Sequence, residues 1–109
     1  MKNYEEITID EMLSLDSDEY EIIDIRDEIA FAYGTINGAV NIPQNRLEEN
    51  VDTLAKDKLL IICCKSGIIS DPVAEKLRQK GFNAANLKEG YYGYMLSQLK
   101  NDTDKAKDV

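Results

Sequence analysis

The second of two adjacent cysteines, Cys64, is the residue of this chain whose type and setting most favour chemistry. It follows the apolar run Leu59–Cys63 and precedes a short loop that contains Gly67. Five consecutive apolar residues without a charge are typical of a strand buried on both faces of a parallel sheet. A helix is predicted to begin after the loop, at Ser70 or Asp71. Cys64 is therefore expected at the carboxyl end of a buried strand, where loop amides and a helix N-terminus favour the thiolate.

The loop after Cys64 is predicted to hold a thiolate mainly through its backbone. A helix N-terminus contributes on the order of 1 kcal/mol, which is less than one unit of the thiol pKa. Several inward-pointing amides would add hydrogen bonds to the sulfur, Lys65 would add a positive charge, and Gly67 would allow a tight turn. Cys63 lies inside the predicted strand, and we expect it to be a core residue. The residues predicted to bind the substrate are Lys65, Ser66, Gly67, Ile68, Ile69 and Ser70.

Signals at both ends define the helix that follows the loop. Ser70 or Asp71 can serve as its N-cap, and Pro72 fits the first turn, where no amide hydrogen is needed. Basic side chains precede Gly81, a pattern typical of the last turn and the end of a helix. The helix is therefore expected between Ser70 and Gly81.

Strands and helices alternate along the rest of the chain, which predicts an α/β fold with a parallel sheet and helices on both faces. Ligands of such sheets bind outside the carboxyl ends of the strands, where Cys64 is expected. The domain is expected to span residues 1–99, followed by a polar, frayed tail over residues 100–109. The predicted strands are Tyr4–Ile7, Tyr20–Ile25, Ala39–Ile42, Leu59–Cys64 and Asn83–Leu87. The other predicted helices are one begun by a capping box of Thr8 and Glu11, Asp27–Tyr33, a weakly amphipathic Asn45–Ala55 broken near Asn50, and Tyr91–Leu99.

Composition and charge exclude several classes of function. The 109 residues suffice for one domain, and 43% hydrophobic with 31% charged residues is typical of a soluble globular protein. No apolar run reaches the length of a membrane span, and no signal-peptide region follows Met1, so a cytoplasmic protein without membrane contact is expected. Two adjacent cysteines without histidine make a poor zinc site, so no metal is expected.

Negative charge is concentrated at the N-terminal end of the chain. Residues 1–30 hold eleven acids and two bases, so their net charge is −9. The remaining residues have a net charge of +1, which gives the chain its total of −8. Because nothing forms a basic stripe, nucleic acid is not an expected partner. The acidic third is interpreted as a solvated face, with a docking surface for a basic partner as the alternative.

Several short motifs, taken in order and at their spacings, resemble those of single-domain rhodaneses, which are sulfurtransferases. The resemblance covers nearly the whole domain and implies a five-stranded parallel sheet flanked by helices, with Cys64 as the nucleophile that accepts sulfur. It also implies that Asp24 and Arg26 support the site by ion pairing, and a purely structural salt bridge is an equal alternative. The motifs are Ile22–Arg26, Tyr33–Pro43, Cys64–Gly67, Gly81–Phe82 and Leu87–Gly90.

The chain departs from the family pattern at two positions. Thr35 stands where the family often has histidine, which we interpret as a local structural change. Ile69 stands where many members have arginine, five residues after the cysteine. A guanidinium there would bind an anionic donor through two hydrogen bonds. Its replacement predicts weak use of thiosulfate and a preference for less charged persulfide donors.

The sequence thus predicts transfer of sulfane sulfur from a thiosulfate or persulfide donor to a thiol or cyanide acceptor, through a persulfide on Cys64 and without a cofactor. Expected partners are a small sulfur donor or a persulfide-bearing protein, and a thiol acceptor. A cysteine phosphatase or arsenate reductase is disfavoured, because the loop has no arginine to stabilise a transferred phosphoryl group. The alternative from another class is a non-catalytic or regulatory module that binds a partner through Ile68 and Ile69. A disulfide between Cys63 and Cys64 would strain the backbone and is a minor alternative.

Overall fold

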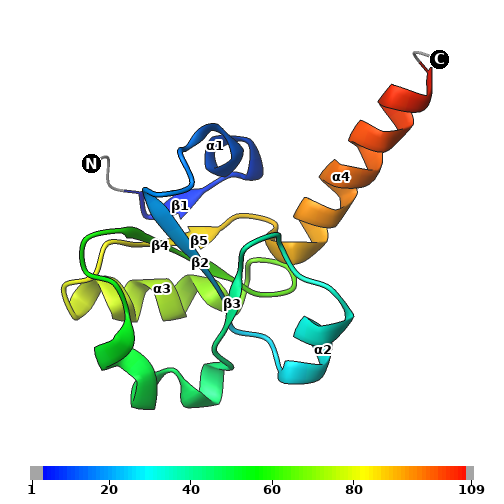
Figure 1. The fold of residues 1–109 in the computed structure, drawn as a ribbon. Helices are drawn as coiled ribbons and strands as arrows, with labels where there is room; N and C mark the ends of the chain where they lie inside the picture. The colour runs from blue at the N-terminus through cyan, green and yellow to red at the C-terminus, as the bar shows by residue number, and fades with distance from the viewer. Residues whose placement is uncertain (1–3, 108–109) are drawn as a thin grey trace.

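The computed structural model, which describes residues 4–107, has a five-stranded, wholly parallel sheet (Figure 1). The strand order is β1-β5-β4-β2-β3, so β4 lies at the centre and β1 and β3 form the edges. The predicted α/β fold with a five-stranded parallel sheet is confirmed. The strands are β1 Glu6–Ile7, β2 Tyr20–Asp24, β3 Val40–Asn41, β4 Leu59–Cys63 and β5 Ala84–Leu87.

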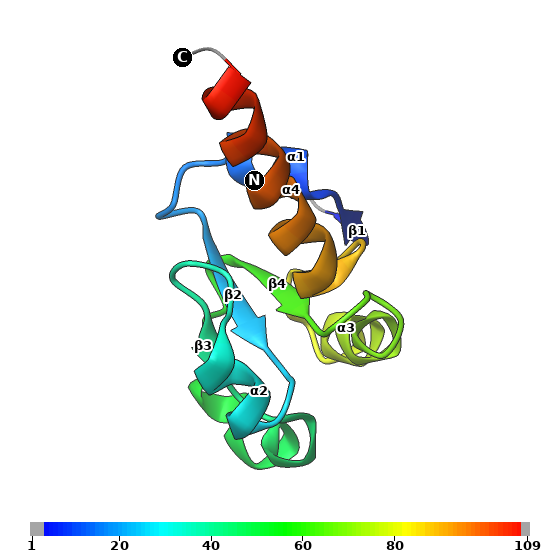
Figure 2. The same cartoon turned by 90° about the vertical axis from the view of Figure 1, so that its right-hand side faces the viewer.

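Helices cover both faces of the sheet, as predicted. Helices α1 and α4 lie on one face, and α3 lies on the other together with two short 3₁₀ helices (Figures 1 and 2). Helix α4 begins just after the carboxyl end of β5, and its C-terminal part projects away from the body of the domain (Figure 1). No helix in residues 4–107 has the length and apolar character needed to cross a bilayer. The helices are α1 Ile9–Ser14, α2 Glu28–Tyr33, η1 Gln44–Arg46, η2 Glu48–Thr53, α3 Ser70–Gln79 and α4 Gly90–Lys107.

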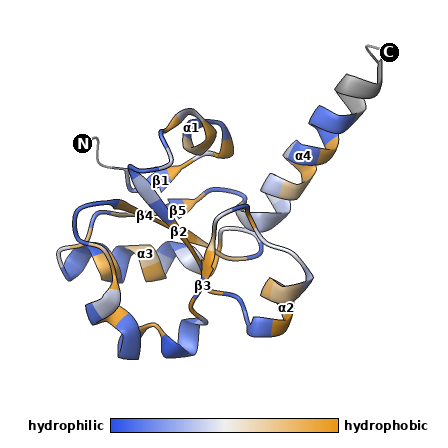
Figure 3. Ribbon diagram, viewed as in Figure 1, coloured by the Kyte–Doolittle hydropathy of each residue, from blue (hydrophilic) through white to orange (hydrophobic). Residues whose placement is uncertain are grey.

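The core consists of two layers, one on each face of the sheet. All five residues of β4 are buried, and their side chains alternate between the two layers. Leu60 and Ile62 pack with Val73 and Leu77 of α3, whereas Ile61 packs on the other face with α1. Strand β4 is accordingly coloured as apolar along its whole length (Figure 3). A strand buried on both faces explains why β4 shows no polar alternation.

Helix-capping signals were informative at two of the short helices. Thr8 and Glu11 form the predicted capping box of α1, with Thr8 Oγ1 accepting from the Glu11 amide at 3.1 Å. Asp27 caps α2, and Gly34 ends it. Both caps use residues within one turn of the helix they bound, so local sequence was sufficient to find them.

The predicted helix over Asn45–Ala55 is wrong, because this segment forms the two 3₁₀ helices η1 and η2, which meet at Leu47 rather than near Asn50. Asn50 Nδ2 donates to the Arg46 carbonyl at 2.8 Å, and Thr53 Oγ1 donates to the Asn50 carbonyl at 2.6 Å. These local bonds use carbonyls that an α-helix would need, and they favour the tighter turns.

Two helix boundaries also differ from the prediction. The N-cap of α3 is Ile69, with no side-chain cap, so neither Ser70 nor Asp71 has that role. Helix α4 continues past Leu99 to Lys107, so most of the predicted tail is helical. Residues 100–107 contain no glycine or proline to stop the helix, and they include lysine and alanine, which favour it. The last two residues of the predicted tail lie outside the described residues.

Candidate active site

Cys64 is the first residue after β4, at the edge of the sheet where the carboxyl ends of the strands meet. Its neighbour Cys63 is paired with Asp24 of β2 in the sheet register, and the Ile25 amide donates to the Cys63 carbonyl at 2.9 Å. The Cys64 side chain is 5% exposed. The buried strand β4 thus places the thiol at this edge of the sheet. Cys64 itself is one residue beyond Cys63, the last residue of the strand.

Three hydrogen-bonding groups surround the Cys64 sulfur. The Gly67 amide donates to Sγ at 3.2 Å, and the Ser70 amide donates at 3.3 Å. The Ser70 hydroxyl oxygen lies 3.1 Å from Sγ. The predicted amide cradle is therefore present, and the first residue of α3 is part of it. This role of Ser70 explains why it does not cap the helix.

The cradle favours the thiolate form of Cys64 in spite of its burial. Burial is the largest single influence, and it raises the pKa of this thiol. Hydrogen bonds from the Ser70 hydroxyl, the Ser70 amide and the amides of Ser66 and Gly67 act in the opposite direction, and together they lower the Cys64 pKa below its ordinary value of 9.0. Cys64 therefore has a larger thiolate population near neutral pH than an ordinary cysteine.

The loop keeps its shape through close backbone packing against the turn between β5 and α4. Gly67 has φ +89°, and a Cβ placed on it would lie 2.9 Å from the Glu89 amide nitrogen. A Cβ on Gly90 would lie 2.5 Å from the Cys64 carbonyl oxygen. The amides of Tyr91 and Tyr92, at the start of α4, donate at 2.9 Å to the carbonyls of Cys64 and Lys65, respectively. Both glycines are needed because backbone meets backbone at this point.

Asn86 of β5 is a site residue that the sequence analysis missed. Its Oδ1 accepts a hydrogen bond from the Ser70 hydroxyl, and its Nδ2 donates to the Gly67 carbonyl at 2.9 Å. Asn86 is 2% exposed. An amide side chain inside the otherwise apolar strand Ala84–Leu87 was the available signal, because a buried polar group requires partners.

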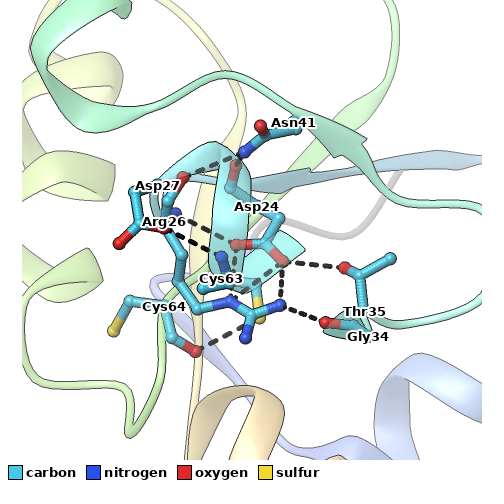
Figure 4. Close-up of polar contacts among 9 residues, drawn as sticks. Asp24, Arg26, Asp27, Gly34, Thr35, Asn41, Cys63 and Cys64 are labelled. Atoms are coloured by element: carbon cyan, nitrogen blue, oxygen red, sulfur yellow. Dashed lines mark hydrogen bonds and ion pairs between the residues drawn. The ribbon is translucent and has the colours of Figure 1, made fainter. Parts of the chain in front are cut away.

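Asp24 and Arg26 form the predicted ion pair, with Arg26 Nη2 2.6 Å from Asp24 Oδ2. The hydrogen bond to Asp24 is the main reason that the pKa of Arg26 is raised above its ordinary value. Thr35 Oγ1 donates to the same carboxylate at 2.7 Å, and Arg26 Nη2 also donates to the Gly34 carbonyl (Figure 4). The guanidinium carbon lies 4.3 Å from the centre of the Tyr91 ring. The pair thus fixes the segment after α2.

This ion pair does not contact the thiol of Cys64. Asp24 is paired with Cys63 in the sheet, and the charges of Asp24 and Arg26 act on the Cys63 thiol. Figure 4 shows the Cys64 sulfur pointing away from the Arg26 guanidinium. The geometry therefore favours the structural interpretation of the pair over a direct role.

The remaining predicted site residues contribute exposed side chains around the cradle. Ile68 is 76% exposed and Ile69 56%, so neither folds inward onto the core. Lys65 is also exposed and lines a shallow hollow with Ser66 and Tyr92. The structure thus brings the backbone of Ser66, Gly67 and Ser70 to the sulfur, whereas the side chains of Lys65, Ile68 and Ile69 are open to solvent.

Cys63 is a core residue, as predicted. It is fully buried, and its thiol is free, as is that of Cys64. Burial raises the pKa of Cys63 from 9.0 to about 12, with the Asp24 carboxylate adding to this effect. Cys63 is therefore a neutral thiol at physiological pH. Within residues 4–107, histidine, cysteine, aspartate and glutamate form no group of three that could hold a metal ion.

Comparisons with known proteins agree with this geometry. The model of the rhodanese-like domain family matches residues 8–97. YtwF of Bacillus subtilis is 32% identical over 83% of this chain and 86% of its own. The thiosulfate sulfurtransferase GlpE of Shewanella oneidensis is 27% identical over 76% of this chain and 83% of its own. The structure of the human single-domain sulfurtransferase TSTD1 superposes with a TM-score of 0.73 at 25% identity, covering 84% of this chain and 95% of its own. The chain therefore belongs to the rhodanese-like domain family.

Proposed function

We propose that this protein is a sulfurtransferase in which the Cys64 thiolate accepts a sulfane sulfur atom and passes it to a second nucleophile. The observation that supports this most strongly is the cradle, in which the amides of Gly67 and Ser70 and the Ser70 hydroxyl surround one sulfur atom. Hydrogen bonds of this kind stabilise a thiolate and an anionic persulfide alike. The names of GlpE and TSTD1 as sulfurtransferases support the same activity.

The reaction is a double displacement. The Cys64 thiolate attacks the outer sulfur of the donor, a new S–S bond forms, and the S–S bond of the donor breaks, releasing sulfite from thiosulfate or a thiolate from a persulfide. An acceptor thiolate or cyanide then attacks the outer sulfur of the Cys64 persulfide. That second step yields a new persulfide or thiocyanate and returns Cys64 as the thiolate.

The side chains of the loop support a donor of low charge. Ile69 stands at the position where arginine would bind a dianion, and Ile69 and Ile68 together present an apolar surface beside the cradle. Thiosulfate would receive amide hydrogen bonds but no guanidinium contact there. We therefore expect persulfide donors, small or carried by a protein, to be used more efficiently than thiosulfate.

Intact-mass analysis after incubation with glutathione persulfide tests the chemistry. The wild type and Cys63→Ser should each gain one sulfur atom that a thiol reductant removes, and Cys64→Ser should gain none. Cys63→Ser is the matched control, because it changes the adjacent thiol on the other face of the sheet. If neither the wild type nor Cys63→Ser gains sulfur, the proposal fails.

A binding module without turnover is the second candidate, because two adjacent isoleucines are exposed on the same loop. Apolar side chains gathered on a loop are a common feature of contact surfaces. The mass experiment separates the two candidates, since a module that only binds has no need to hold sulfur. Phosphatase activity is not expected, because the loop supplies no arginine for a phosphoryl group, and assays with aryl phosphates should show no turnover.

A further inference from the structure

A buried chain of hydrogen bonds links the nucleophile to the opposite side of its loop. The chain runs from Cys64 Sγ to Ser70 Oγ at 3.1 Å, from Ser70 Oγ to Asn86 Oδ1, and from Asn86 Nδ2 to the Gly67 carbonyl at 2.9 Å. Cys64 is 5% exposed, Ser70 is fully buried and Asn86 is 2% exposed. Because water has little access to this chain, each hydrogen in it must find a partner among these groups.

Counting the hydrogens fixes the direction of each bond. The Gly67 carbonyl can only accept, so the Asn86 amide group must turn its NH₂ towards Gly67. Oδ1 of Asn86 then faces Ser70 and can only accept, so Ser70 donates its single hydroxyl hydrogen to Asn86. While Cys64 is protonated, Ser70 Oγ consequently presents a lone pair to it, and the Cys64 S–H is the donor in their contact. The Ser70 hydroxyl lowers the Cys64 pKa only where it donates to the thiolate. The geometry of the contact by itself fits a donor on either side.

We propose that Asn86 is a positioning residue that holds the Ser70 hydroxyl as a hydrogen-bond acceptor for the Cys64 thiol, so that this hydroxyl can donate to the Cys64 thiolate only by turning from Asn86 to the sulfur. When the S–H proton leaves for solvent, the sulfur needs donors, and the Ser70 hydroxyl is one of the nearest. Rotating that hydroxyl breaks no covalent bond, but it leaves Asn86 Oδ1 without its donor in a buried place. Asn86 therefore opposes the ionisation that the loop amides favour.

The effect limits how acidic Cys64 becomes. A thiolate loses nucleophilicity as its pKa falls, and the best attacking thiol has a pKa near the ambient pH. Asn86 would keep Cys64 in that range, and this use of Asn86 rests on the proposed sulfurtransferase function. The hydrogen-bond switch itself does not, because it concerns the thiol without any donor.

Fixed charges around the site stay the same when Asn86 is changed, which makes the switch measurable. The elements that meet around Cys64 carry several titratable and charged groups. They are Asp24, Arg26 and Asp27 at and after the end of β2, Cys63 and Lys65 around the end of β4, Asp71, Glu75, Lys76 and Arg78 on α3, Lys88 and Glu89 after β5, and Tyr91, Tyr92 and Tyr94 at the start of α4. Replacing Asn86 by alanine alters none of these side chains. A shift in the pH dependence of Cys64 can then be assigned to the hydrogen bonds rather than to charge.

The test is a cycle of four proteins: the wild type, Asn86→Ala, Ser70→Ala and the double variant. The apparent pKa of Cys64 is measured below about pH 9 from thiolate absorbance, relative to Cys64→Ser, and from the rate of alkylation by iodoacetamide. In the presence of Ser70, removing Asn86 frees the hydroxyl for the thiolate. Asn86→Ala should therefore lower the Cys64 pKa when Ser70 is present. This change in pKa should be more negative, by about half a unit to one unit, than the change that Asn86→Ala causes in the Ser70→Ala background.

Equal effects of Asn86→Ala in the two backgrounds would overturn the proposal, since a merely loosened loop shifts both alike. Asn41→Ala is the matched control, because Asn41 Nδ2 also donates to backbone carbonyls, those of Asp24 and Arg26, but Asn41 makes no hydrogen bond in the chain from Cys64 to Gly67. It should leave the Cys64 pKa unchanged.

A second measurement needs no change at Asn86, in case Asn86→Ala does not fold. The NMR signals of the Asn86 side-chain amide should shift with an inflection at the Cys64 pKa in the wild type. That inflection should be markedly smaller in Ser70→Ala, where only Gly67 and the charge of the thiolate still couple the two groups, and an undiminished inflection there would overturn the proposal. Because no sulfur donor is used, failure of the switch and failure of sulfur transfer are seen in separate experiments.

Discussion

Cys63 and Cys64 are neighbours in the chain, yet their side chains lie on opposite faces of the sheet. Cys63 packs in the layer beneath α1, beside Ile61, whereas Cys64 faces the layer that contains α3. Burial beside Asp24 raises the pKa of Cys63 to about 12, and the amide cradle lowers that of Cys64. One thiol is therefore a neutral core residue and the other is the more readily ionised of the two, for reasons of position alone.

The buried thiol of Cys63 predicts a loss of stability at alkaline pH. Its folded-state pKa of about 12 lies above the ordinary value of 9.0, so the stability that it contributes is complete below pH 9 and is lost as pH rises towards 12. The free energy of unfolding should fall by up to about 1.4 kcal/mol per pH unit from this group. Cys63→Ala lacks it. Urea unfolding at about pH 8 and about pH 10.5 should show a smaller alkaline loss in the variant, and equal losses would contradict the prediction.

Removing the Asp24 carboxylate should destabilise the fold more than it affects the chemistry. Asp24 is fully buried and Arg26 is 12% exposed, so Asp24→Asn leaves a largely buried guanidinium without its partner. We expect a loss of about 3 kcal/mol or more in the free energy of unfolding. At a temperature where the variant is folded, the rate of persulfide formation on Cys64 should stay within a few-fold of the wild type. A large fall in that rate in folded protein would instead assign the pair a direct role. Asp27→Ala, which removes an exposed N-cap, is the control and should cost about 1 kcal/mol.

A comparison of Gly67 with Gly81 separates the backbone strain of a positive φ from the steric clash of an added Cβ with neighbouring atoms. Both have positive φ, +89° and +95°, but a Cβ on Gly81 meets nothing within 4 Å, whereas a Cβ on Gly67 would lie 2.9 Å from the Glu89 nitrogen and 3.0 Å from the Leu87 oxygen. Gly81→Ala should cost about 1–2 kcal/mol from strain alone and leave sulfur uptake intact. Gly67→Ala should cost more and slow persulfide formation by about tenfold or more, because the amide on the sulfur must move. Equal effects of the two changes on uptake would show that the loop tolerates the shift.

Features encoded by neighbouring residues could be predicted from the sequence. The buried strand before Cys64, the turn at Gly67 and the capping box of α1 each depend on residues within a few positions of one another. The sheet follows from the alternation of such segments. The ion pair of Asp24 and Arg26 was accessible because the family resemblance pointed to it, and their two-residue spacing places both at the end of one strand.

Features that depend on contacts between distant parts of the chain could not be predicted from the sequence. Ser70 has the local chemistry of an N-cap, but Cys64 and Asn86 use its hydrogen-bonding groups, and Asn86 lies sixteen residues away. Over Asn45–Ala55, apolar residues recur at intervals of three and four, which fits an α-helix and a 3₁₀ segment equally well. Side-chain bonds to the backbone decided between them. In both places the structure depends on hydrogen bonds of polar side chains, and the spacing of the apolar residues does not indicate their partners.

Ile69→Arg should shift the donor preference towards thiosulfate. Ile69 is 56% exposed at the N-cap of α3, next to the amide of Ser70, so an arginine there is free to reach over the cradle without entering the core. A guanidinium adds two charge-assisted hydrogen bonds to a dianion and little to a donor of low charge. We expect kcat/KM for thiosulfate to rise by about tenfold or more, with a smaller change for glutathione persulfide.

Leu13→Arg is the control for this change, because Leu13 is 51% exposed on α1, which covers the opposite face of the sheet. It adds the same charge to the protein without placing it at the loop, and both donors should be used as by the wild type. A rise in thiosulfate use in Leu13→Arg equal to that in Ile69→Arg would mean that net charge, rather than a contact at the cradle, limits this donor. If Ile69→Arg leaves the ratio of the two donors unchanged, the side chain at this position does not select the donor, and the preference must arise from the backbone of the loop.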